Sequence, residues 1–295
     1  MRLALALALA LVLSPPGESE AQEKLHVVTT SYDLRSLVEA VGGERVSVES
    51  LSVPEQDPHV VELKPAQLAR LQGAALLVRI GLDHEPWLSR IRIAEGLRVL
   101  DASRGVPLLQ TETPRLRVER RAHAHAFGNT HYWLDPQNAL PITASILEAL
   151  VKLSPADRER FAANRKSFLS RLGNGIERWQ AALAPFRGMR VVVMHDSWVY
   201  FAERFGLSIV AAAEPVPGVP PSPAELAALY RSMREAGVTV LIAEPHSNPE
   251  LVRQIEDKGG ARAVMLLPSG RDYIGLFDED VGRLVSAMKR GPRPR

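Results

Sequence analysis

Short apolar runs alternate with amphipathic segments along most of the chain. In the N-terminal half, runs of aliphatic and β-branched residues predict strands at 25–29, 46–51, 75–80 and 97–100. Helical patterns begin between these runs, near Ser31, Pro65 and Glu85. The alternation restarts in the C-terminal half, where it predicts strands at 190–194, 208–212, 238–243 and 263–267. Strands that alternate with helices indicate an α/β fold with parallel sheets.

The region between the two halves carries the clearest helical pattern. One helix is predicted over 138–153 and a longer one over 155–183, for which Ser154 is a suitable N-cap and Pro155 a suitable first residue. The apolar residues of the longer segment recur at spacings of three, four and seven and form one stripe of Phe161, Phe168, Leu172, Ile176, Trp179 and Leu183. At about 1.5 Å per residue this helix is about 40 Å long, enough to run along two lobes.

The N-terminus has the pattern of a secretion signal. Arg2 is followed by an unbroken apolar run from Leu3 to Leu13, then by Pro15 and small residues near Ala21. The run is much shorter than the roughly 20 residues that span a bilayer, so we expect a periplasmic protein without a membrane anchor. The expected segments are a signal peptide at 1–21, an N-terminal lobe at 22–153, a linking helix at 154–185 and a C-terminal lobe at 186–291.

Composition narrows the class of protein. The 295 residues are 46% hydrophobic and 24% charged, which suffices for two medium-sized lobes. The chain has no cysteine, which excludes disulfides and a lipid-modified N-terminal cysteine. Lys and Arg (36) nearly balance Asp and Glu (34), and the local basic stretches at 115–121 and 289–295 contain no interleaved aromatic residues. Nucleic acid is therefore not an expected partner.

Four candidate metal ligands lie where a loop meets a strand or a helix. They are far apart in the sequence: His59, His131, His195 and Asp272. His195 directly follows a predicted strand, His59 and Asp272 follow the second and the last strands, and His131 precedes a helix. Loops at the carboxyl ends of parallel strands line the crevice in such folds. The placement predicts a transition-metal site between the lobes, with two ligands from each.

Several short motifs and their order carry a family resemblance. Between His26 and Met288 the chain contains DPHVVELKPAQLARLQGAALLVRIG, HYWLDP, HDSWVYFAERFGL, AEP and RDY. These motifs resemble the solute-binding proteins of zinc and manganese ABC importers, the ZnuA/TroA type. The resemblance implies two β/α lobes around a rigid linking helix, metal held by His59, His131, His195 and Asp272, and delivery to the membrane permease of an importer. We expect a monomer that is not an enzyme.

The expected ligand types favour zinc. Three imidazoles and one carboxylate suit Zn²⁺ in tetrahedral geometry better than Mn²⁺, which prefers more oxygen. Manganese-preferring members of the family often carry a carboxylate at the position of His195. A bidentate Asp272 could enlarge the coordination, so Mn²⁺ or Fe²⁺ remain alternatives. The linker that is histidine-rich in many zinc-binding members holds only His123 and His125 here, which form a possible auxiliary metal loop or an exposed segment without metal.

Other polar residues near these motifs have two interpretations. Glu244 is expected behind the ligands, whereas Asp135 and Asp196 could either orient an imidazole or cap a helix. The remaining histidines outside the linker, His26, His84 and His246, are expected to be structural or solvent-exposed.

Two other functional classes are compatible with a metal site. A periplasmic zinc-dependent hydrolase would keep an open coordination position and a nearby base, but the sequence has no H-E-x-x-H cluster. An adhesion protein stapled by metal would usually carry local pairs of ligands instead of four distant ones.

Overall fold

The computed structural model describes residues 23–54, 56, 57, 59, 61–110, 128–214 and 220–291. The expected signal peptide, as well as His123 and His125, lies outside these residues. In the part that is described, no helix combines the length and the apolar character needed to cross a bilayer.

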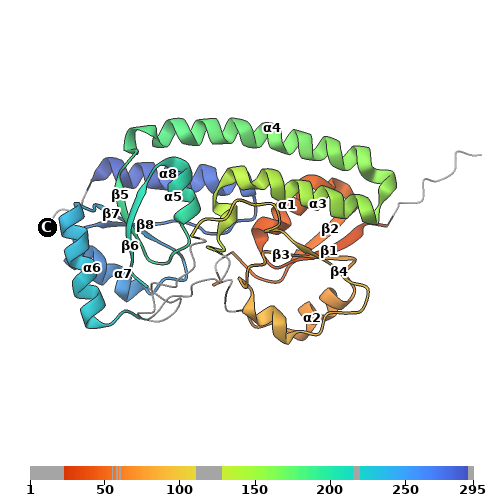
Figure 1. Cartoon of the computed structure of the whole chain (residues 1–295), viewed down its shortest axis with the longest axis horizontal. Coiled ribbons are helices and arrows are strands. Elements are labelled where there is room, and N and C mark those ends of the chain that lie inside the picture. The colour runs from red at the N-terminus through yellow and green to blue at the C-terminus, as the bar shows by residue number, and fades with distance from the viewer. Residues whose placement is uncertain are drawn as a thin grey trace, which may run out of the picture.

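Two four-stranded parallel sheets occupy the two halves of the molecule (Figure 1). The first sheet has the order β2-β1-β3-β4 and contains β1 (Leu25–Thr29), β2 (Val46–Ser50), β3 (Leu76–Arg79) and β4 (Arg98–Asp101). The second has the order β6-β5-β7-β8 and contains β5 (Arg190–Val193), β6 (Ser208–Ala212), β7 (Val240–Ala243) and β8 (Arg262–Met265). The prediction of an α/β fold with two parallel sheets is confirmed. All eight strands appear within two residues of their predicted bounds.

Helices connect the strands and cover both faces of the sheets. They are α1 (Tyr32–Gly42), α2 (Pro65–Gln72), α3 (Ala139–Leu153), α5 (Val199–Phe205), α6 (Pro223–Ala236), α7 (Pro249–Gly259) and α8 (Tyr273–Arg290). Short 3-10 turns lie at Gly43–Arg45, Pro86–Arg90, Tyr132–Leu134, Pro136–Asn138, Pro155–Asp157 and Ala184–Phe186. Local capping explains several starts: Ser31 accepts from the backbone NH of Leu34, and Ser222 forms a capping box with Glu225.

The helix expected near Glu85 is reduced to the single 3-10 turn Pro86–Arg90. Beyond this turn, Ile91 and Ile93 both pack against the apolar cluster that contains Trp87 and Leu88. A spacing of two residues places both side chains on one side of an extended chain but on different faces of a helix. The chain therefore continues to β4 without a helix.

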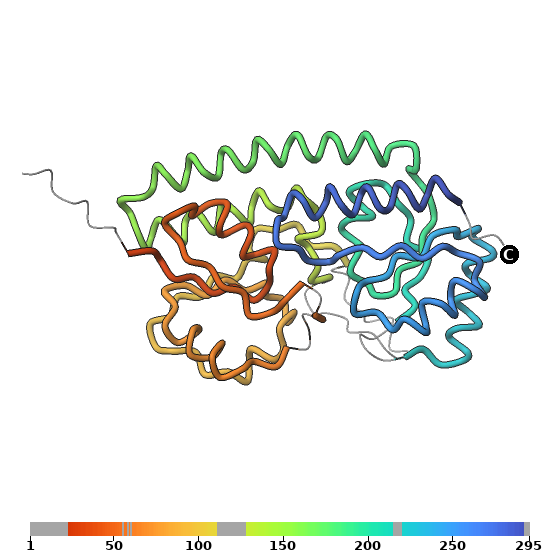
Figure 2. Tube along the Cα trace, turned by 180° about the vertical axis from the view of Figure 1, so that it is seen from behind, coloured from red at the N-terminus to blue at the C-terminus, as the bar shows by residue number. Residues whose placement is uncertain are grey.

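The long helix α4 (Arg158–Leu183) runs across both halves, with α8 beneath it (Figure 1, Figure 2). Every residue of its predicted apolar stripe is buried. Ser154 and Pro155 occupy the predicted N-cap and first positions, but of a 3-10 turn, Pro155–Asp157, that leads into α4, and the side chain of Ser154 makes no capping hydrogen bond. Ser154 donates its hydroxyl to the carboxylate of Asp157 (2.7 Å), which also pairs with Arg45 (3.0 Å). The start of α4 is thereby tied to the N-terminal half.

The two halves share one hydrophobic core and several buried hydrogen bonds. A single cluster of buried residues extends from β1 through α4 to α8. Trp133 donates its indole NH to the carbonyl of Pro268 (2.8 Å), and the hydroxyl of Tyr273 donates to the carbonyl of Trp133 (2.6 Å). These contacts fix the loop after β8 against the N-terminal half. The expected lobe boundaries near residues 153 and 185 stay a prediction.

Candidate metal centre

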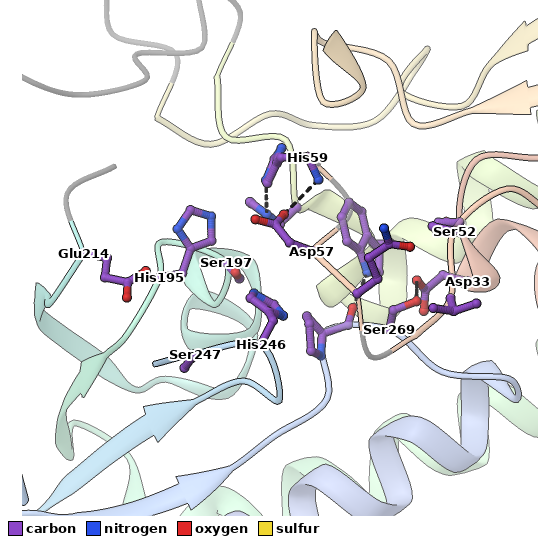
Figure 3. Close-up of a pocket in the computed structure, with 16 residues that line it drawn as sticks. Asp33, Ser52, Asp57, His59, His195, Ser197, Glu214, His246, Ser247 and Ser269 are labelled. Atoms are coloured by element: carbon purple, nitrogen blue, oxygen red, sulfur yellow. Dashed lines mark hydrogen bonds between the residues drawn. The ribbon is translucent and has the colours of Figure 1, made fainter. Parts of the chain in front are cut away.

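A pocket lies between the carboxyl ends of the two sheets (Figure 3). Both sheets have the order in which their first strand lies inside, so the loops after β1 and β3, and after β5 and β7, leave the sheet toward opposite faces. The crevice opens at this point. Its lining includes three histidines expected to be ligands, one further histidine and three carboxyl groups: His59, His131, His195, His246, Asp33, Asp57 and Glu214.

Four imidazole rings gather at this pocket, three of them in its lining and the ring of His84 buried behind them. The Nε2 atoms of His59 and His131 are 3.3 Å apart. The ring of His84 lies 4.2 Å from that of His59 and 5.2 Å from that of His131, measured between centroids. The ring of His195 lies 5.7 Å from that of His59 and 5.3 Å from that of His131. His59, His84 and His131 each offer a ligand atom, and these atoms all lie within 4.8 Å of one another.

Hydrogen bonds to Nδ1 orient these rings. Nδ1 of His59 contacts the carbonyl oxygen of His84 (3.0 Å), and Nδ1 of His131 contacts the side-chain oxygen of Asn129 (3.1 Å). Both partners are oxygens that can only accept, so Nδ1 must carry the proton in each ring. In the neutral form of each ring, Nε2 is then the unprotonated nitrogen, which is the form that binds metal. At 3.3 Å the two Nε2 atoms can share one proton or bind one metal ion between them.

The distance itself suits a shared ion. Two ligand nitrogens bound to one tetrahedral zinc at about 2.05 Å are separated by about 3.3 Å. The separation of the Nε2 atoms of His59 and His131 has this value. The two residues come from loops far apart in the sequence, and the fold brings them to bonding distance of one ion.

A constrained turn after β3 positions His84. Gly81, Leu82 and Asp83 all have positive φ angles (81°, 55° and 58°), a backbone conformation that residues other than glycine rarely adopt. The carboxylate of Glu85 accepts from the backbone NH groups of Ile80 (2.6 Å) and Gly81 (3.0 Å), which closes the turn. Burial raises the pKa of Glu85 to about 7, although these bonds act in the opposite direction.

The side chain of Glu85 also accepts from the hydroxyl of Thr30 (2.6 Å), which follows β1. His84 is fully buried, and its Nδ1 lies 2.8 Å from the hydroxyl of Thr130. Thr130 directly precedes His131. The turn therefore holds His84 against the segment that carries another imidazole of the cluster.

Carboxylates surround the imidazoles on the C-terminal side and at the loop of His59. Asp57 accepts from the backbone NH of His59 (2.9 Å), and Glu214 follows β6 (Figure 3). His246 follows β7, and burial lowers its pKa while the charge of Asp57 raises it. The pocket thus combines nitrogen donors with negative charge, a combination suited to a divalent cation.

Glu244 and Asp196, two of the residues expected near the ligands, make different contacts. Glu244 is buried and accepts from Trp198 (2.7 Å) and Ser247 (3.0 Å), and its burial raises its pKa to about 7. The carbonyl oxygen of Asp196 accepts from the amide of Asn129 (2.8 Å), the residue that orients His131.

Asp135 accepts from the backbone NH of Gln137 (2.9 Å) and pairs with Arg204 (2.7 Å). For Asp135 these contacts favour the capping interpretation over the orientation of an imidazole.

Of the four predicted ligands, the structure brings together His59, His131 and His195. Asp272 is not among the described residues that line the pocket. Its side chain is exposed and caps α8 by accepting from the backbone NH of Ile274 (3.2 Å). The carboxylate is therefore occupied at the start of a helix, and its role as a ligand stays a prediction.

Two histidines that were not predicted as ligands also lie at the site. His84 was expected to be structural or exposed but lies inside the imidazole cluster, and His246 lines the pocket. Both follow the carboxyl end of a strand, β3 and β7 respectively. The criterion that selected His195 would have selected them as well.

Comparison with known proteins places this geometry in context. The family model for the zinc-uptake complex component A, periplasmic, matches residues 27–287. The zinc-binding protein AdcA of Streptococcus pyogenes serotype M3 is 23% identical over 289 residues, which cover 90% of this chain and 56% of AdcA. The chain thus spans about half the length of this relative. The high-affinity zinc uptake system protein ZnuA of Brucella abortus is 25% identical, with 92% of this chain and 93% of the relative covered.

Solved structures show the same arrangement of elements. A crystal structure of ZnuA matches with a TM-score of 0.79 and 26% identity, covering 90% of this chain and 99% of that one. The solute-binding protein FpvC of Pseudomonas aeruginosa in complex with Mn²⁺ matches with a TM-score of 0.77 and 24% identity, covering 91% and 98%. The second likeness concerns the fold alone.

Proposed function

The chain belongs to the family of the periplasmic component A of zinc-uptake complexes, and from this premise we propose that it binds Zn²⁺ in the periplasm and delivers it to the permease of an ABC importer. His59, His131 and His195 are the proposed ligands common to the sequence and the structure. Asp272 would have to turn away from the start of α8 to join them.

The observation that carries this proposal is the pair of facing Nε2 atoms of His59 and His131, 3.3 Å apart. Imidazole nitrogens favour zinc over manganese, which prefers oxygen. Asp57 and Glu214 supply oxygens in the same pocket, and Mn²⁺ or Fe²⁺ are therefore the alternative cargoes. Members of this family are components of zinc-uptake complexes, which supports a binding role over the hydrolase and adhesion alternatives.

Competitive titration tests the choice of metal. Purified, metal-stripped protein is titrated with Zn²⁺ and Mn²⁺ against a chromophoric chelator. We expect one tightly bound Zn²⁺ per chain and weaker Mn²⁺ binding. His131→Ala should lose zinc affinity, whereas His26→Ala is the matched control, because His26 lies in β1 and contacts Gly73 and Glu49. Equal effects of the two substitutions, or an absence of zinc binding, would refute the proposal.

Delivery is tested in cells. Deletion of the gene from its host should impair growth in medium depleted of metal by a chelator, and added zinc should restore it. Restoration by manganese and not by zinc would identify the alternative cargo. Assays of the zinc-loaded protein against peptides, esters and phosphates address the hydrolase alternative, for which turnover would be required.

A further inference from the structure

His84 occupies a position that its role as a structural histidine does not explain. It is fully buried, and its ring centroid lies closer to that of His59 than the rings of His131 and His195 do. Its ring also meets that of Trp133 edge-on at 5.1 Å, which limits its freedom to turn. An imidazole is placed here among three others, on a turn that holds it in place.

The contacts of His84 follow the pattern of the other two rings. One ring nitrogen, Nδ1, lies 2.8 Å from the hydroxyl of Thr130, as Nδ1 of His131 lies against Asn129 and Nδ1 of His59 against the carbonyl of His84 itself. A polar contact at Nδ1 commonly orients an imidazole so that Nε2 binds the metal. The ligand atoms of His59, His84 and His131 lie within 4.8 Å of one another, so movements of about an ångström would bring all three to the spacing of about 3.3 Å on one zinc.

We propose that His84 supplies the fourth ligand of the metal centre through Nε2, in place of Asp272, so that four imidazoles hold the ion. This inference rests on the proposed function of the site. His84 already lies within the cluster, whereas Asp272 is exposed and caps α8. The rearrangement needed to complete the coordination sphere is smaller for His84.

Carboxylates in the pocket lining can balance the charge of an ion that four neutral imidazoles hold. They leave the double positive charge of the ion without a directly bound anion, and the carboxylates of Asp57 and Glu214 line the same pocket. An all-nitrogen set also increases the preference for Zn²⁺, Ni²⁺ or Cu²⁺ over Mn²⁺. The proposed fourth ligand therefore makes the site more selective against manganese than a site that contains Asp272.

The test compares two substitutions in the full chain. His84→Asn keeps a polar group near the position of Nδ1, facing Thr130, but removes Nε2, and Asp272→Ala removes the competing carboxylate. His26→Asn is the matched control outside the site. Zinc affinity is measured by chelator competition, thermal unfolding of the metal-free proteins reports on folding, and X-ray absorption at the zinc edge reports the ligand types in the wild-type protein.

We expect His84→Asn to weaken zinc binding at least about tenfold, because a bond to the ion is lost. Asp272→Ala and His26→Asn should stay within about twofold, and the absorption spectrum should fit four imidazole nitrogens. Wild-type affinity in His84→Asn, a tenfold loss in Asp272→Ala, or a spectrum with a carboxylate oxygen among the ligands would overturn the proposal.

The spectrum of the wild-type protein decides the question even if His84→Asn unfolds. Failure of this inference is also separable from failure of the proposed function. If wild-type protein binds zinc and His131→Ala does not, the uptake function stands whatever the result at His84.

Discussion

Asn129 is the residue whose replacement tests most directly how the site is built. It is buried, with 3% of its surface exposed, and its side-chain oxygen accepts from the backbone NH (3.0 Å) and from Nδ1 (3.1 Å) of His131. Its amide donates to the carbonyl of Asp196 in the other half of the chain (2.8 Å). One side chain thus orients a proposed ligand and links the two sides of the crevice.

Asn129→Ala removes the acceptor that keeps the proton on Nδ1 of His131. Loss of such an orienting partner typically lowers metal affinity by about 10- to 100-fold, which corresponds to about 1.4–2.7 kcal/mol. The same change leaves buried polar groups of His131 and Asp196 without this partner, which should reduce the free energy of unfolding by about 1–3 kcal/mol. Affinity and stability should both fall.

Asn129→Asp separates the two effects. The carboxylate still accepts from Nδ1 of His131, but it cannot donate to Asp196, and it places a second negative charge nearby. This variant should lose stability yet keep zinc affinity within a few fold of wild type. Chelator competition measures the affinity of each variant, and urea unfolding of the metal-free protein measures stability.

Asn164→Ala is the matched control for these variants, since the amide of Asn164 donates to the carbonyl of Val41 (3.1 Å) outside the pocket. Wild-type affinity in Asn129→Ala, or an equally large loss in Asn129→Asp, would refute the orienting role.

Three further predictions concern the ligands and a buried acid. His59→Ala, His131→Ala and His195→Ala should each weaken zinc binding at least about tenfold in the chelator assay, and unchanged affinity would remove that residue from the site. His195→Glu should lower the ratio of Zn²⁺ to Mn²⁺ affinity, and an unchanged or higher ratio would contradict the ligand-softness argument. Burial raises the pKa of Asp280 from 3.8 to about 8, so the folded state holds a proton that the unfolded state has lost. The stability that this proton gives is complete below about pH 4 and is lost as pH rises through about 8. The free energy of unfolding of Asp280→Asn should therefore rise relative to wild type by about 1.4 kcal/mol per pH unit between about pH 5 and 7, measured by urea unfolding. A difference between the two proteins that does not change with pH would contradict this.

The fold was predictable because its signals are local. The strand β7 is an apolar run bounded by polar residues, and the stripe on α4 repeats over six turns. Such patterns report which residues are buried on a sheet or along a helix. The failures occur where a tertiary contact competes with a local preference. Ser154 occupies the N-cap position, but its hydroxyl donates to the carboxylate of Asp157, which Arg45 holds, and makes no capping hydrogen bond.

Part of the candidate site was predictable from position in the chain. His59, His131 and His195 lie near strand or helix ends, and the structure brings them to one pocket. Position does not reveal the direction in which a side chain leaves a turn, however. The consecutive positive φ angles of Leu82 and Asp83 precede His84 in its buried position, and no periodicity in the sequence marks them.

Strand order explains why His84 lies in the imidazole cluster while Asp272 lies at the start of α8. The inner strands β3, β5 and β7 are followed within a few residues by His84, His195 and His246. Short loops thus bring His195 and His246 to the pocket lining and His84 into the buried imidazole cluster. Asp272 follows the edge strand β8 through a longer loop that ends at the first turn of α8, where free backbone NH groups attract a carboxylate. At the start of α8 the carboxylate of Asp272 has a local partner, the backbone NH of Ile274, which holds it on the helix. An acidic residue at the start of a helix therefore has two competing assignments, cap and ligand, and its place after a strand does not decide between them.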